Sequence, residues 1–195
     1  EAHGAKYKGR KVGTFGTAGT FSFYGNKIVT TGEGGMIVTN DSELNEKIRL
    51  LRDHGMSRTR KYWHSVLGYN YRMTNLQGAI GMAQMEKIES IISKKKIIAN
   101  TYEENLKNIK GITLPPKMSW ADSVFWLYTI LIDKEVFGVN AEKIILECEK
   151  ENIDTRRIFP PLHTQPIYKT GQKLPVSEKL SDSGISLPSA PILRT

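Results

Sequence analysis

The residue with the clearest chemical potential is Lys27, which follows a run of strand-forming residues and a Gly25-Asn26 turn. A lysine that forms an imine with an aldehyde must sit in a preformed, partly desolvated pocket, because its amine must be available near neutral pH. A phosphate group on such an aldehyde needs hydroxyl and backbone N–H donors. Ser22 precedes Lys27, and the glycine-rich segment Gly32-Glu33-Gly34-Gly35 follows it. The segment therefore contains the parts for this chemistry, although a lysine after a turn is more often simply solvated.

The elements that must position this lysine follow from the residue pattern. Residues 20–24 are β-branched and aromatic and predict a short buried strand, and residues 36–39 predict another. Asn40 is expected to cap a helix, with Glu43 completing a capping box, and Gly55 is expected to stop it. The lysine and the glycine-rich turn thus lie between two expected strands.

Residues 56–73 are polar and aromatic without a period, which is typical of a functional or disordered segment. Its aromatic residues argue against disorder and suit a dimer interface. Thr74 and Gln77 predict a second capping box. The helix that follows is expected to continue to about Ile109, with a bend near Ser93.

The pattern changes at Gly111. Residues 112–114, 125–132 and 155–159 predict strands, and a helix is expected from Asn140 to about Glu149. The chain is then expected to be extended loop rather than helix, because it contains the prolines Pro160, Pro161, Pro166 and Pro175. This order predicts an α/β fold with a large first part, residues 1–110, and a small α/β domain, residues 111–195.

The composition narrows the function classes. The chain has 195 residues, 39% of them hydrophobic, and a formal net charge of +8. No apolar run is long enough to predict a transmembrane helix, and no signal-peptide pattern is found. No nucleic-acid-binding motif or basic stripe is found either, so the charge indicates a diffuse positive surface or a preference for an anionic substrate. Cys148 is the only cysteine, so we expect no intrachain disulfide, no metal site and a reducing cytoplasmic location.

Several motifs in one order resemble the DegT/DnrJ/StrS aminotransferases, and most closely their perosamine-synthase-like members. The resemblance rests on GTFGTAGTFSFYGNK at 13–27, TTGEGG at 30–35, GYNYRMTN at 68–75, TRR at 155–157, PLH at 161–163, PIY at 166–168, PVSE at 175–178 and LP at 187–188. These enzymes have the aspartate aminotransferase-like fold called fold type I and use pyridoxal 5'-phosphate (PLP). The resemblance implies the C-terminal part of the large domain, including a long connecting helix, and the small C-terminal domain.

The resemblance also implies residues that this sequence does not contain. Family members are about twice as long. Their phosphate-binding turn, the aromatic ring that stacks on PLP and the Asp that pairs with the pyridine nitrogen would all precede Glu1. We therefore expect these 195 residues to be part of a longer polypeptide.

Four residues carry over to the cofactor. Lys27 matches the catalytic lysine that holds PLP and moves a proton between substrate and cofactor, and Ser22 matches a hydroxyl that binds its phosphate. Glu1 stands near the cofactor ring, where the family often has Gln, and a carboxylate there needs a charged or protonated partner. Asn70 matches a residue that reaches the PLP phosphate of the partner subunit, which implies a homodimer with a shared active site.

Three further residues carry over to the substrate. His163 matches a loop histidine near the sugar-nucleotide pocket, Arg156 lies near the same loop, and Tyr69 is assigned with them. Simpler interpretations remain open: the Ser22 hydroxyl bonded to backbone, Asn70 holding a turn, and His163 as an exposed loop residue.

The resemblance implies transfer of an amino group from L-glutamate to a keto group of a nucleotide-linked deoxy sugar, for cell-surface polysaccharide or lipopolysaccharide. A rival function is that of a sugar dehydratase of the same fold that uses pyridoxamine phosphate, but such relatives carry His where Lys27 stands. Two more rival interpretations are a non-catalytic regulatory protein and an inactive fragment.

Overall fold

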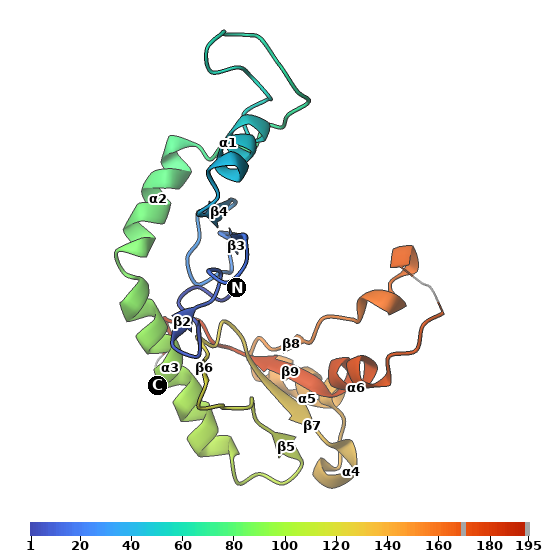
Figure 1. The fold of residues 1–195 in the computed structure, drawn as a ribbon. Helices are drawn as coiled ribbons and strands as arrows, with labels where there is room; N and C mark the ends of the chain where they lie inside the picture. The colour runs from blue at the N-terminus through green and yellow to red at the C-terminus, as the bar shows by residue number, and fades with distance from the viewer. Residues whose placement is uncertain (169–170, 194–195) are drawn as a thin grey trace. The chain divides into compact units, whose positions relative to one another are not determined.

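The computed structural model describes residues 1–168 and 171–193, and its contacts divide the chain into two compact units. The first is Glu1–Ile92 with Met118–Val124, and the second is Ser93–Lys117 with Phe125–Thr195. Figure 1 labels the helices and strands along the chain. Met118–Val124 therefore belongs to the first unit, although it comes later in the sequence. The division into domains after residue 110 stays a prediction.

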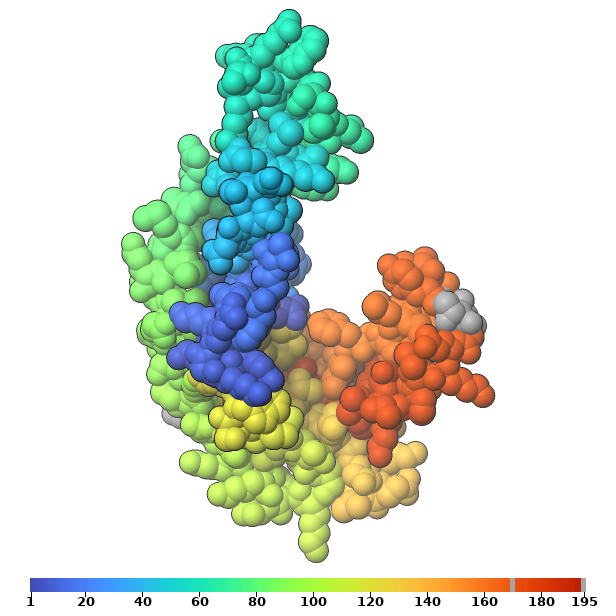
Figure 2. Space-filling view, viewed as in Figure 1, coloured from blue at the N-terminus to red at the C-terminus, as the bar shows by residue number. Residues whose placement is uncertain are grey.

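The first unit is built from short antiparallel strands and the helices that follow them. Its elements are β1 Lys6–Tyr7, β2 Arg10–Lys11, β3 Ala18–Ser22, β4 Gly35–Thr39, α1 Ser42–Leu51, α2 Asn75–Met85, the start of α3 Ile88–Leu106, and β6 Ala121–Asp122. One sheet has the order β2-β1-β6, and β3 pairs with β4. Figure 2 shows the yellow Met118–Val124 segment against the blue N-terminal residues, where the Lys8 N–H donates to the Trp120 carbonyl at 2.6 Å.

Strand β3 differs slightly from the predicted strand, because it begins before residue 20 and ends at Ser22 rather than Tyr24. Its last pair with β4 sets Ser22 opposite Gly35. A Cβ at Gly19 would collide with the main chain of Gly13, so the close approach of these two segments requires glycine there. The strand thus ends at Ser22, the residue for which the family resemblance implies phosphate binding.

The helix caps are partly as predicted. The N-cap prediction at Asn40 is wrong: Asp41 caps α1, and its carboxylate accepts the Leu44 N–H at 3.0 Å. An Asp at this position satisfies a free N–H and adds a negative charge at the positive end of the helix. The capping box of Thr74 and Gln77 at the start of α2 is confirmed.

The single long helix predicted to about Ile109 is two helices, and the break lies at Glu86–Lys87 rather than near Ser93. The Lys87 N–H bonds to the Gln84 carbonyl at 3.1 Å, three residues back instead of four. This tighter turn ends α2 before α3 begins.

The apolar residues of α2 lie on the surface of this unit, since Leu76 is 79% exposed and Met82 is 69% exposed. None of the helices described, in residues 1–168 and 171–193, combines the length and the apolar character needed to cross a membrane.

The second unit is one antiparallel sheet with helices. Its elements are the rest of α3, β5 Ile112–Thr113, β7 Tyr128–Ile132, α4 Lys134–Phe137, α5 Ala141–Lys150, β8 Arg156–Arg157, the 3-10 turns η1 Leu162–Thr164 and η2 Pro166–Tyr168, α6 Pro175–Ser183, and β9 Gly184–Leu187. The strand order is β5-β7-β9-β8. The predicted start of α5 is confirmed, because Asn140 caps it and accepts the Lys143 N–H at 2.9 Å.

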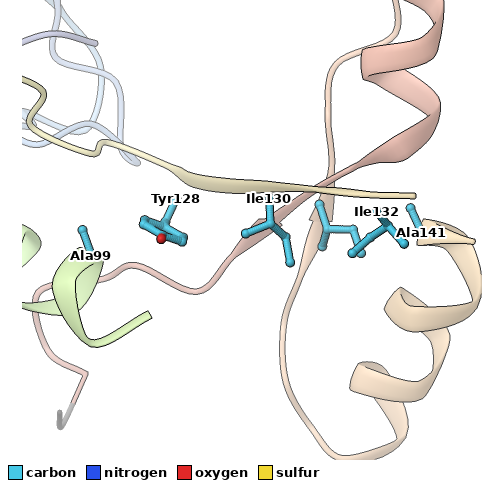
Figure 3. Close-up of a cluster of buried hydrophobic side chains, with 6 residues drawn as sticks. Ala99, Tyr128, Ile130, Ile132 and Ala141 are labelled. Carbon is cyan, nitrogen blue, oxygen red and sulfur yellow. The ribbon is translucent and has the colours of Figure 1, made fainter. Parts of the chain in front are cut away.

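The core of this unit lies on one face of β7. Tyr128, Ile130 and Ile132 alternate along the strand and point to the same side (Figure 3), as the period of a strand requires. They pack with Ala99 of α3 and Ala141 of α5, together with Ile185 of β9. The apolar residues of these elements therefore share one interior.

The prediction that the proline-rich C-terminal stretch is loop throughout is wrong for α6. This helix begins at Pro175, which is tolerated in the first turn because its missing N–H would have no helical partner there. The first part of the stretch forms only the short turns η1 and η2. Strand β9, which follows α6 directly, was also not predicted. It is an inner strand of the sheet and lies between β7 and β8.

Candidate active site

Lys27 lies in a closed turn between β3 and β4. The Phe23 N–H donates to the Gly34 carbonyl at 2.9 Å, and the Thr31 N–H donates to the Phe23 carbonyl at 2.9 Å. After Lys27, Ile28 and Val29 are buried, with 6% and 0% of their surface exposed. These contacts fix the backbone on both sides, and the Lys27 side chain is only 9% exposed. The partly desolvated setting expected of an imine-forming lysine is present.

Glu1 is the ionic partner of Lys27. Lys27 Nζ donates to Glu1 Oε1 at 2.6 Å, and the Glu1 side chain is 56% exposed. The charged partner that a carboxylate at this position was expected to need is therefore Lys27 itself. The two residues lie 26 positions apart in sequence, so this contact depends on the fold.

The glycine-rich turn is held by main-chain contacts. Gly32 and Gly34 have φ values of 81° and 143°, which a residue with a side chain rarely adopts. The Glu33 carbonyl accepts from Thr31 Oγ1 at 2.6 Å and from Gln77 Nε2 at 3.0 Å. Gln77 thus links the start of α2 to the turn, and the backbone of Glu33 shapes it.

Ser22 is the last residue of β3, and its Oγ accepts the Tyr24 N–H at 3.3 Å. This is the simpler arrangement considered for Ser22, a hydroxyl bonded to backbone. Accepting a hydrogen bond leaves the hydroxyl hydrogen available for donation, so this contact is compatible with a phosphate ligand.

Sequence reasoning missed His3, which is buried beside these residues with 4% of its surface exposed. Its ring stacks on Phe23 with centroids 5.8 Å apart and is tilted against Phe21 at 5.6 Å. Burial lowers its pKa, and the positive charges of the amino terminus and, to a smaller extent, of Lys27 lower it further. Phe21 and Phe23 alternate along the chain, which places their rings on one face, but no local signal in the sequence links His3 to them.

Tyr69 and Asn70 are fixed to the end of α1. The Tyr69 N–H donates to the Leu51 carbonyl at 2.7 Å, and Asn70 forms an antiparallel bridge with Asp53. The rings of Tyr69 and Tyr71 stack in parallel with centroids 5.2 Å apart. These contacts place both residues at the end of α1 rather than at the Lys27 turn.

His163 and Arg156 belong to the second unit. The His163 side chain is only 8% exposed, and its Nε2 donates to Glu178 Oε1 at 2.9 Å, so the interpretation of an exposed loop residue is wrong. The hydrogen bond that Glu178 accepts from His163 lowers the pKa of Glu178. The hydrogen bond from the Leu174 N–H lowers it by a smaller amount. Arg156 lies in β8 with its guanidinium 3.5 Å from Asp154.

Comparison with known proteins gives a consistent result. A sequence model of the DegT/DnrJ/EryC1/StrS aminotransferase family matches residues 1–195. The chain is 43% identical to the GDP-perosamine synthase of Escherichia coli O157:H7, over 99% of this chain and 52% of that protein. It is 40% identical to the GDP-perosamine synthase of Caulobacter vibrioides, over 97% of this chain and 52% of that protein.

A solved structure agrees with these sequences. The chain resembles Helicobacter pylori PseC, described as an aminotransferase involved in pseudoaminic acid biosynthesis, with a TM-score of 0.91 and 33% identity. The match covers 100% of this chain and 54% of that one. The fold-type prediction is confirmed, and the chain spans about half the length of the relatives it matches.

Proposed function

The chain belongs to the DegT/DnrJ/EryC1/StrS aminotransferase family, and on that premise we propose that it works as part of a PLP-dependent sugar-nucleotide aminotransferase. The reaction moves an amino group from L-glutamate to a keto group of a nucleotide-linked deoxy sugar. The observation that carries the proposal is Lys27, whose side chain is 9% exposed, lies in a closed turn and bonds to Glu1.

The residues of the first unit fit PLP. Lys27 offers a primary amine for the aldehyde, and the Ser22 hydroxyl retains its hydrogen for a phosphate oxygen. Glu1 lies against the amine at the place proposed for the cofactor ring. When bound, PLP supplies an electron sink for the bonds at the reacting carbon.

The residues of the chain then have distinct roles. Lys27 holds the cofactor and carries a proton to and from the substrate carbon, Ser22 binds the phosphate, and Glu1 orients the amine. His163, Arg156 and Tyr69 contribute to sugar-nucleotide binding. The positive net charge of +8 favours a substrate with a diphosphate.

We further propose that the protein is a cytoplasmic homodimer whose subunits share each active site, with Asn70 reaching the PLP phosphate of the partner subunit. The loop that carries Asn70 exposes large apolar residues: Leu67 is 85% exposed, Tyr62 77% and Tyr71 74%. Aromatic residues of this kind are enriched in interfaces. A role in cell-surface polysaccharide or lipopolysaccharide synthesis fits relatives named GDP-perosamine synthase.

The two half-reactions test the proposal directly. PLP-loaded protein is mixed with L-glutamate, and 2-oxoglutarate, the keto acid left by loss of the amino group, is measured. The protein, whose cofactor now carries the amino group, is then offered a GDP-linked 4-keto-6-deoxy sugar, and the amino sugar is detected by mass. The proposal expects both products from the wild type and neither from Lys27→Ala, whereas loss of the sugar hydroxyl without amination would identify a dehydratase. A protein that gives neither product contradicts the proposal.

A further inference from the structure

The most informative group that the proposed mechanism does not use is His3. Within the described residues, neither ring nitrogen has a hydrogen-bond partner of ordinary geometry. The Ser22 main chain lies near enough to favour the protonated ring, but burial outweighs it and lowers the pKa of His3. A buried polar ring without good partners is costly, so its position calls for an explanation.

The contacts of His3 fix its segment against β3. The ring is stacked on Phe23 and tilted against Phe21, the two residues that flank Ser22. On the other side, the Ala5 N–H donates to the Ala2 carbonyl at 3.0 Å and forms a turn around His3. At His3 the segment is therefore attached through one aromatic side chain and a backbone turn, and from Lys6 onward it is held by the pairing of β1 with β2 and β6.

This attachment determines where Glu1 lies. Glu1 is two residues before His3, its side chain is 56% exposed, and it contacts Lys27 at 2.6 Å. Solvent around the Glu1 carboxylate screens its attraction to the Lys27 ammonium, so this ion pair is the weaker attachment of the segment. The buried ring of His3 is the stronger anchor.

We propose that His3 is a positioning residue whose ring anchors the segment that brings Glu1 to Lys27 and braces β3 at Ser22. The effect of His3 on PLP binding rests on the proposed function, whereas the anchoring of the segment is independent of it.

Acid should release the anchor. Protonation would bury a charge beside Lys27, and among the residues that the structure describes the ring faces Phe21, Phe23 and the Ser22 main chain. Glu1, the nearest carboxylate along the segment, is already bonded to Lys27. Because an unpaired buried charge is strongly unfavourable, we expect the ring to leave its place rather than carry the charge there.

The anchoring is tested without cofactor, by reductive methylation at neutral pH and mass mapping. His3→Phe keeps a ring between Phe21 and Phe23, whereas His3→Ala removes it. We expect Lys27 to be methylated several-fold faster in His3→Ala than in the wild type, with His3→Phe like the wild type and the exposed Lys94 as internal reference. Equal rates at Lys27 in all three proteins overturn the proposal, and thermal melts show that the variants are folded.

The effect on the cofactor is tested by titration with PLP and with pyridoxal, which lacks the phosphate. Below about pH 6.5, wild-type affinity for PLP should fall by up to tenfold per pH unit more than that of His3→Phe. Titration of the PLP phosphate affects the wild type and His3→Phe equally, so it does not contribute to the difference between them. With pyridoxal, which has no phosphate for Ser22 to bind, the difference in acid dependence between the two proteins should be smaller. Identical acid dependence in the two proteins contradicts the proposal. A wild type that binds no PLP at any pH contradicts the proposed function instead, while the methylation result still decides the anchoring.

Discussion

Lys95 in α3 provides a quantitative test of the second unit, because it is a lysine with only 5% of its surface exposed. Its ammonium donates to the Trp126 carbonyl at 2.9 Å, the Ser189 carbonyl at 2.7 Å and Ser189 Oγ at 3.1 Å. It thereby joins α3 to the residues before β7 and after β9. The perturbation is Lys95→Met, which keeps the apolar stem and removes the charge.

The magnitude follows from proton linkage. Burial lowers the pKa of Lys95 from 10.5 to about 8. Between these values the unfolded chain binds a proton that the folded chain does not, so the free energy of unfolding should rise with pH. One proton gives at most about 1.4 kcal/mol per pH unit. The three acceptors favour the ammonium and reduce this gain, so we expect roughly 1 kcal/mol between about pH 8 and pH 9.5.

Urea unfolding measured across this interval checks the expectation. Burial raises the pKa of Tyr102 and, with Glu103 nearby, that of Tyr128, and both act in the opposite direction at higher pH. The interval therefore ends below about pH 10. The wild type and the control Lys94→Met, at an exposed neighbour, should gain stability with pH, and Lys95→Met should gain less. Parallel pH dependence in wild type and Lys95→Met would refute the reasoning.

Two further predictions concern local structure. Asp41→Ala should lower the free energy of unfolding by about 1 kcal/mol because Asp41 caps α1, and Asn40→Ala should change it by a few tenths; equal effects in urea unfolding would contradict the assigned cap. Gly19→Ala should cost more than about 2 kcal/mol because its Cβ would strike the main chain of Gly13. Gly78→Ala, inside α2 with open space around it, should instead stabilise this chain by up to about 1 kcal/mol, as thermal melts would show.

The sequence predicted local features well where the signal is local. The capping box of Thr74 and Gln77, the cap at Asn140 and the strand of residues 36–39 depend on neighbouring residues and are confirmed. The prediction of the fold class depended on several motifs that occur in one order along the chain. No single motif would have supported that prediction.

Features that depend on the fold could not be predicted in the same way. No sequence pattern places His3 between Phe21 and Phe23, because these residues are distant in the chain. The sequence led us to expect a charged or protonated partner for Glu1, but it did not identify that partner as Lys27. Helix α6 was missed because Pro175 was taken as a helix breaker, although proline is tolerated in a first turn.

The central claim is that Lys27 is the residue that binds PLP, and covalent trapping tests it most directly. The protein is incubated with PLP, its absorption band is recorded, and borohydride reduction is followed by peptide mass mapping. The account predicts a pyridoxyl group on Lys27 and loss of the band in Lys27→Ala. A band that persists in Lys27→Ala, or a label on another lysine in the wild type, would contradict it.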